Sequence, residues 1–190
     1  MRPLVTPTIE SLAVYEAGKP VEELARERGV TDAVKLASNE NPLGPSPLAL
    51  EAMSRVLGGV NRYPDAAAYR LREKLASVHG VGMEEIVQGN GSNELIELCV
   101  RTFATPGDHV VFAEPAFVVY RLASLAHGVP FTAVPLKSWT HDLEAMADAI
   151  TERTRAVIVC SPNNPTGPIV TQAEFDAFVA RVPADVLVIL

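Results

Sequence analysis

Apolar and polar residues follow two different patterns along the chain, and the change lies near residue 84. The first part reads as short helical segments that irregular stretches connect. These predicted helices cover residues 20–28, 46–57 and 67–79. Ser46 followed by Pro47 is typical of a helix start, and Gly29 and Gly80 are typical of helix ends. We therefore predict an N-terminal arm and helical segment over residues 1–84.

From residue 85 onward, apolar runs that read as strands alternate with helical segments. The predicted strands are 85–88, 109–113, 131–134, 156–160 and 186–190, and the predicted helices are 93–103, 117–127, 143–150 and 172–182. Thr171 with Glu174 three residues later forms a capping box, which secures the start of the last helix. Several strands are continuously apolar, as in a parallel sheet covered on both faces. We predict an α/β fold, doubly wound and mostly parallel, with residues 85–190 forming the first part of the α/β domain.

Composition and charge narrow the class of protein. The chain has 190 residues, 48% of them hydrophobic, so it can bury a sizeable core. Its net charge of −7 and the lack of a basic stripe argue against a nucleic-acid partner. The first residues lack the apolar core of a signal peptide, and no apolar run approaches the length of a membrane span. We expect a cytoplasmic protein with no membrane partner. The two cysteines have no metal-type spacing.

The loops after the strands of such a sheet are where ligands bind. The first of them, "QGNGSNE" at 88–94, has glycines before a predicted helix start, and free amides at a helix start attract an anion. A phosphate is the natural ligand, although a plain glycine turn with Ser92 or Asn93 as cap explains the loop equally well. A dinucleotide fingerprint is a rival interpretation, because Glu114 ends the next strand. It fails because Glu94 stands where the third glycine is needed.

Two further loops carry side chains of interest. Phe117 follows a strand end and a proline in "EPAFVVYR", where its ring would lie against a flat ligand or pack into the core. In "SPNNPTG" at 161–167, prolines fix the backbone while Asn163 and Asn164 offer amide hydrogen bonds at the sheet edge. A rigid turn explains any four of these residues but explains all seven poorly.

These motifs together carry a family resemblance. "SPNNPTG", "GNGSNE" and "KLASNENPLGPSP" resemble the fold-type I aminotransferases that use pyridoxal 5′-phosphate, and among them the histidinol-phosphate aminotransferases. "NRYPD" at 61–65 and "LAVYEAGKP" at 12–20 are also similar to that family, except that Val14 stands where the family has proline. The resemblance covers the chain from about residue 5 to its last residue.

The resemblance implies a set of cofactor contacts. Backbone amides of Ser92, Asn93 and Glu94 would bind the cofactor phosphate, which agrees with the anion site inferred from the residues alone. Phe117 would stack on the pyridine ring, where the family commonly has tyrosine, and Asn164 would hydrogen-bond the phenolic oxygen of the cofactor.

The resemblance also implies an active site shared across a homodimer. Tyr63 would reach the cofactor phosphate of the neighbouring subunit, and Tyr15 would contribute to the partner's substrate pocket. The substrates implied are an amino acid or amino phosphate and 2-oxoglutarate. No metal is implied.

The Schiff-base lysine and the acid that pairs with the pyridinium nitrogen are not found at matching positions. The lysines are Lys19, Lys35, Lys74 and Lys137, and none follows a late strand. Both groups are expected beyond Leu190, so we interpret the chain as the N-terminal portion of a histidinol-phosphate:2-oxoglutarate aminotransferase of histidine biosynthesis, inactive as this fragment. The alternatives are an aromatic or other aminotransferase, a decarboxylase of a phosphorylated amino acid with the same fold, or a non-catalytic truncated chain.

Overall fold

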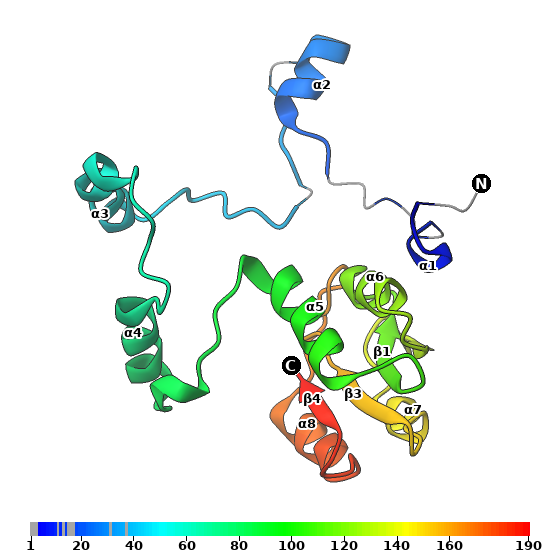
Figure 1. Cartoon of the computed structure of the whole chain (residues 1–190). Coiled ribbons are helices and arrows are strands. Elements are labelled where there is room, and N and C mark those ends of the chain that lie inside the picture. The colour runs from blue at the N-terminus through cyan, green and yellow to red at the C-terminus, as the bar shows by residue number, and fades with distance from the viewer. Residues whose placement is uncertain (1–3, 11, 13, 15–17, 31, 37) are drawn as a thin grey trace. The chain divides into compact units, whose positions relative to one another are not determined.

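The computed structural model describes residues 4–10, 12, 14, 18–30, 32–36 and 38–190 (Figure 1). By its internal contacts the chain divides into two units. One unit, here called the α/β unit, consists of Met1–Leu12 and Val87–Leu190. The other, here called the helical unit, consists of Ala13–Ile86. In the described residues, no helix has the length and apolar character needed to cross a membrane.

The α/β unit is built on a parallel sheet of four strands in the order β2-β1-β3-β4. The strands are β1 (His109–Glu114), β2 (Phe131–Pro135), β3 (Thr154–Ile158) and β4 (Leu187–Ile189). Val111 of β1 lies opposite Thr132 of β2 and Val157 of β3. Buried Val, Phe and Ile residues dominate the two central strands, as the continuous apolar runs predicted.

Helices cover both faces of this sheet, because successive strand residues point to opposite sides. Val110 and Phe112 of β1 pack with α5 (Gly91–Phe103) and α6 (Val119–Ala126). Val111 and Ala113 pack with α7 (Leu143–Asp148) and α8 (Gln172–Val179) on the other face. The predicted doubly wound α/β fold is confirmed. The helix α1 (Pro7–Glu10) lies beside α6.

The prediction of a strand over residues 85–88 is wrong. Glu85 ends a short 3-10 helix, η2 (Met83–Glu85), and Ile86 is extended, with φ −108° and ψ 122°. An extended segment becomes a strand only when a neighbour supplies hydrogen bonds. No strand in the described part of the chain pairs with residues 86–89, and Val87 is 72% exposed.

The helical unit contains the three predicted helices. They are α2 (Val21–Arg28), α3 (Pro47–Val56) and α4 (Tyr69–His79), and a short 3-10 helix, η1 (Leu57–Gly59), follows α3. Gly29 and Gly80 follow α2 and α4 in the left-handed conformation, as the predicted helix ends require. Ser46 precedes α3 at the N-cap position, but its side chain makes no capping hydrogen bond.

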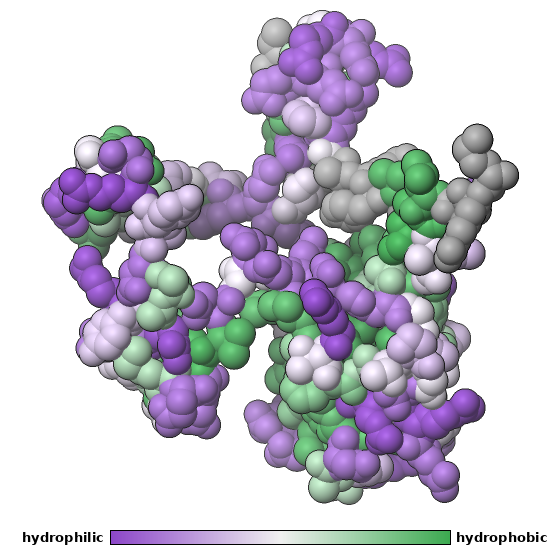
Figure 2. Space-filling model, viewed as in Figure 1, coloured by the Kyte–Doolittle hydropathy of each residue, from purple (hydrophilic) through white to green (hydrophobic). Residues whose placement is uncertain are grey.

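Side chains of the helical unit are not buried. Among its described residues none falls in the buried class, and large apolar side chains such as Leu36, Leu43 and Val34 are more than four-fifths exposed. Figure 2 shows apolar surface mixed with polar surface on α3 and α4. These helices therefore have the composition of packed elements without a core of their own.

Candidate functional site

The candidate site lies at the carboxyl edge of the sheet, between β1 and β3. From β1 the chain crosses one face through α6 to reach β2, whereas from β3 it crosses the other face through α8 to reach β4. The loops that follow these two neighbouring strands therefore diverge. Such a switch point in the strand order is where open α/β sheets bind ligands.

The start of α5 lies at the same edge. Only residues 104–108 connect α5 to β1, so the helix runs back along the strand. Its 13 residues span about 20 Å, roughly the length of a six-residue strand. The first turn of α5 is thus level with the end of β1, where the site predicted from the glycine loop requires it to be.

The first turn of α5 offers free backbone donors. One carboxylate oxygen of Glu94, Oε2, accepts hydrogen bonds from the backbone N–H of Asn90 at 2.5 Å and from its side-chain amide at 3.0 Å. The N–H groups of Ser92 and Asn93 belong to the turn that has no intrahelical acceptors, and both residues are exposed. Gly91 has a φ of 80°, which lets the backbone turn into the helix without a side chain in the way. An anion can approach these amides directly.

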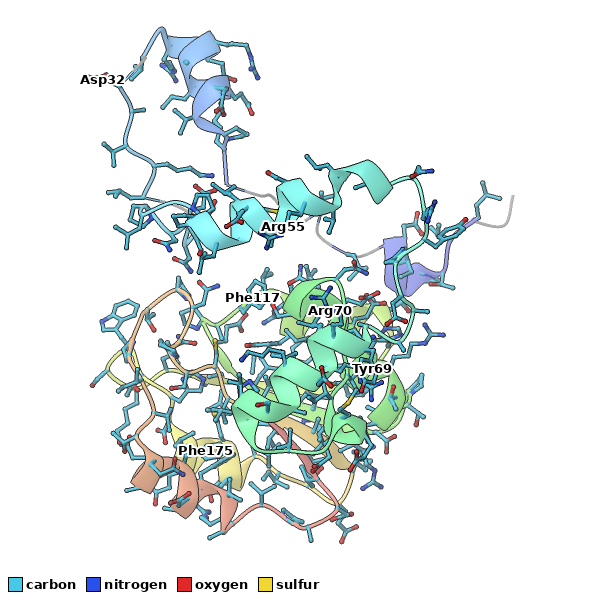
Figure 3. All side chains as sticks on the ribbon, turned by 90° about the vertical axis from the view of Figure 1, so that its left-hand side faces the viewer. Asp32, Arg55, Tyr69, Arg70, Phe117 and Phe175 are labelled. Atoms are coloured by element: carbon cyan, nitrogen blue, oxygen red, sulfur yellow. The ribbon has the colours of Figure 1, made fainter. Side chains whose placement is uncertain are left out.

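Phe117 lies in the loop after β1, just before α6 (Figure 3). Its ring meets the ring of Tyr120 edge-on, with centroids 5.9 Å apart and planes at 89°. The loop is bracketed by an ion pair, in which the Arg121 guanidinium donates to both oxygens of the Glu114 carboxylate at 2.6 Å. A cavity of about 160 Å³ lined by Phe117 and Arg121 opens beside it. The Phe117 ring is half-buried and is in contact with Tyr120 on one side.

The loop after β3 carries the two asparagines. Asn163 is buried, with 3% of its surface exposed, and Asn164 is half-buried. Upstream, the backbone N–H of Cys160 donates to Nε2 of His141 at 3.2 Å, which fixes the end of the strand. Burial lowers the pKa of His141, which favours the neutral ring whose Nε2 can accept this hydrogen bond.

The predicted site residues do not all lie in the same unit of the chain. Ser92, Asn93 and Glu94, with Phe117 and Asn164, all lie at the carboxyl edge of the α/β unit. Tyr63 belongs to the helical unit, where its side chain is fully exposed. Tyr15 lies outside the described residues. From the sequence, Asn163 is expected only to offer an amide hydrogen bond at the sheet edge, and the cofactor contact is given to Asn164. The doubled asparagine is the signal that one of the two side chains faces inward.

The comparisons with known proteins identify the family. The family Aminotransferase class I and II matches residues 31–190. The chain belongs to the class I and II aminotransferases. Within this family it is 49% identical over 182 residues to histidinol-phosphate aminotransferase of Moorella thermoacetica, covering 96% of this chain and 47% of that protein. It is 46% identical over 186 residues to histidinol-phosphate aminotransferase 2 of Hydrogenovibrio crunogenus, covering 98% of this chain and 50% of that protein.

Two solved structures share the fold of this chain. The crystal structure of histidinol-phosphate aminotransferase from Sinorhizobium meliloti, in complex with pyridoxal 5′-phosphate, matches 99% of this chain with a TM-score of 0.85 and 27% identity. The match covers 50% of that structure. Cystalysin from Treponema denticola, at 18% identity and a TM-score of 0.71, shows the same fold. The chain spans about half the length of the curated relatives that it matches.

Proposed function

We propose that these residues form the cofactor-binding half of a pyridoxal-phosphate-dependent histidinol-phosphate:2-oxoglutarate aminotransferase of histidine biosynthesis. One observation carries the proposal: the free amides at the start of α5 and the loops with Phe117 and Asn164 lie at one sheet edge. The matched relatives named above are histidinol-phosphate aminotransferases, and the structure that aligns with nearly the whole chain is a complex with the same cofactor.

The start of α5 fits a phosphate group. The N–H groups of Ser92 and Asn93 and the positive end of the helix dipole favour an anion at this place. The Glu94 carboxylate is tied to Asn90 and would not contact the phosphate. The backbone N–H of Glu94 is the first in the helix with an intrahelical acceptor, the carbonyl of the N-cap residue Asn90, so Ser92 and Asn93 would supply the free donors. This arrangement supports phosphate binding by backbone donors, with no cationic side chain of α5 in its first turn.

The two loops fit an aromatic ring bearing a phenolic oxygen. Phe117 supplies a flat face, and the amide of Asn164 can donate to an oxygen without adding charge. When bound, the cofactor supplies an electron sink for carbanion chemistry, and the protein supplies position and electrostatics. On this proposal Phe117 orients the ring, while Asn164 holds its phenolic oxygen.

The proposal includes a homodimer and a cytoplasmic location. Tyr63 would reach the partner's cofactor phosphate, and Tyr15 would line the partner's substrate pocket. The exposure of Tyr63 and of the apolar side chains on α3 supports a role for the helical unit in covering another surface.

A titration with pyridoxal 5′-phosphate tests the proposal, with pyridoxal as the ligand that lacks the phosphate. The wild-type chain should bind the phosphorylated compound at least tenfold more tightly, and Gly91→Val should remove this preference. A Cβ at Gly91 meets nothing within 4 Å, so Val would obstruct the ligand and strain the backbone, not clash with the chain.

Gly29→Val is the matched control. Gly29 also has a positive φ, of 69°, and open space around it, but it lies in the helical unit. This variant should keep the preference for the phosphorylated compound. Equal affinity of the wild-type chain for the two compounds, or an unchanged preference in Gly91→Val, would contradict the assignment. In the protein that carries these residues, amino transfer from histidinol phosphate should exceed transfer from tyrosine.

A further inference from the structure

One buried side chain connects the two loops that carry Phe117 and Asn164. The pairing of β1 with β3 ends at Phe112 and Ile158, so no ladder hydrogen bond joins the loops beyond that pair. The side-chain amide of Asn163 donates across this gap to the carbonyl oxygen of Pro115 at 3.1 Å. The same nitrogen donates to Oγ1 of Thr166 at 2.7 Å.

A third loop joins through Thr166. Its hydroxyl donates to the carbonyl oxygen of Trp139 at 2.8 Å, in the turn after β2. Asn163 and Thr166 thus link the loops that follow all three adjacent strands β2, β1 and β3, a network here called the loop clasp. Backbone bonds hold Asn163 itself, whose N–H donates to Pro168 and whose carbonyl accepts from Gly167.

The two carbonyl groups at the ends of the loop clasp determine which group donates and which accepts in each of its hydrogen bonds. The carbonyl oxygens of Pro115 and Trp139 can only accept, so the groups that face them must donate. The Thr166 hydroxyl uses its hydrogen on Trp139 and therefore accepts from Asn163. Only a side chain with two donors serves at position 163. An aspartate would set a carboxylate oxygen against a carbonyl oxygen in a buried place.

The turn that receives the clasp is strained. Ser138 and Trp139 have φ values of 51° and 65°, in the left-handed region that residues other than glycine seldom adopt. Lys137 and Thr140 exchange backbone hydrogen bonds across the turn, at 2.9 and 3.1 Å. Strained backbone persists where the surrounding structure constrains it. The bond from Thr166 to the Trp139 carbonyl is one such constraint.

We infer that Asn163, acting with Thr166, is a positioning residue that holds Phe117 and Asn164 in register for the cofactor ring. Pro115 is two residues before Phe117, and Asn163 directly precedes Asn164, so the clasp joins the supports of both proposed ring contacts. The remaining amide oxygen of Asn163, Oδ1, is buried and has no partner among the described residues, so the side chain's contribution comes from its two donors. The inference rests on the proposed function for its ligand.

The first arm of the test uses the chain without ligand. Thr166→Val keeps the size of the side chain and removes the bond to Trp139, whereas Thr166→Ser keeps the hydroxyl. Amide hydrogen exchange of residues 137–140 and 161–168 should be about tenfold faster in Thr166→Val and in Asn163→Asp. Thr166→Ser should match the wild type. Trp139 is the single tryptophan, so its fluorescence anisotropy reports on the same turn and should fall in the first two variants.

The second arm adds pyridoxal 5′-phosphate. Thr166→Val and Asn163→Asp should bind it about tenfold more weakly and shift its absorption spectrum, and Thr166→Ser should restore both properties. Unchanged hydrogen exchange in the first arm overturns the inference whatever the ligand does. Faster hydrogen exchange in the two variants, together with unchanged affinity for pyridoxal 5′-phosphate and an unchanged spectrum, also overturns the inference. A wild-type chain that shows no preference for the phosphorylated compound rejects the proposed function, while faster exchange in the variants would still support the clasp.

Discussion

The α/β unit and the helical unit contain helices of similar length, yet among the residues that the structure describes only the α/β unit has buried core side chains. In the α/β unit, Met146, Val100 and Val157 have no exposed surface. In the helical unit, every described side chain keeps some contact with solvent, and Met53 is 52% exposed. The difference shows that an apolar stripe makes a helix amphipathic, but the stripe is buried only where another element packs against it.

The energetic contrast is large. Covering one Leu, Val or Met side chain contributes about 1.5–3 kcal/mol, and the helical unit leaves many such side chains uncovered. Its local structure relies instead on short-range bonds. Asp65 accepts the backbone N–H groups of Ala67 and Tyr69 ahead of α4, and these bonds hold the pKa of its carboxyl below the usual range. The side chain of Arg72 donates to the carbonyl oxygen of Met83.

The largest expected effect comes from a pair of methionines. Met146 lies in the core of the α/β unit, whereas Met53 is half-exposed on α3. Met146→Ala should lower the free energy of unfolding by about 2–5 kcal/mol, because it leaves a cavity. Met53→Ala should lower it by less than about 0.5 kcal/mol. Urea denaturation followed by circular dichroism measures both. Equal losses would show that the helical unit has a core after all.

Proteolysis separates the two units more directly. Chain segments with few buried contacts open locally at small cost, so a protease reaches them first. Trypsin should cleave within the helical unit, for example at Arg55, at least about tenfold faster than within the α/β unit, for example at Arg155. Mass spectrometry of early fragments gives the order of cleavage. Early cuts in β3 or α8 would reverse the comparison.

Acid should weaken the α/β unit through its buried imidazoles. Burial lowers the pKa of His141, and burial followed by the nearby Arg153 lowers the pKa of His109. The unfolded chain therefore takes up protons first as the pH falls through about 6.5. Stability is complete above this value and decreases below it. Unfolding measured at about pH 8 and about pH 5.5 should show the loss.

His141→Gln is the variant that tests this assignment. Glutamine offers an acceptor to Cys160 without a titrating ring, so the dependence of stability on pH should become shallower. Substitution of an exposed side chain that does not titrate in this pH range would leave the dependence of stability on pH unchanged. A slope identical to that of the wild type would assign the pH dependence to other groups, with His109 as the first to examine.

The sequence was sufficient to predict the elements whose ends are marked by residues a few positions apart. Gly29, Gly80 and the Thr171–Glu174 box each act within a few residues, and the helices that they delimit are present. Apolar runs were sufficient for the four strands of the sheet. The prediction for residues 85–88 failed because a strand also needs a partner, which no local pattern specifies.

The candidate site was only partly predictable for the same reason. The glycine loop and the asparagine loop could be chosen as candidates from their residues alone, but which of Asn163 and Asn164 is buried depends on the fold. The hydrogen bonds of Asn163 to Pro115 and of Thr166 to Trp139 join residues 48 and 27 positions apart. Contacts at that separation arise from the order of the strands, which the loop sequences do not contain.

The smallest expected effect compares one helix cap from each unit. Thr171 accepts the N–H of Glu174 at the start of α8, and Glu174 bonds back to Thr171, whereas Ser46 at the start of α3 makes no capping bond. Thr171→Ala should therefore lower the free energy of unfolding by about 1 kcal/mol, and Ser46→Ala by no more than a few tenths of a kcal/mol. Denaturation midpoints at constant pH measure the two losses. A Ser46→Ala loss as large as that of Thr171→Ala would mean that α3 is capped in solution and that the helical unit is better ordered than its exposed side chains indicate.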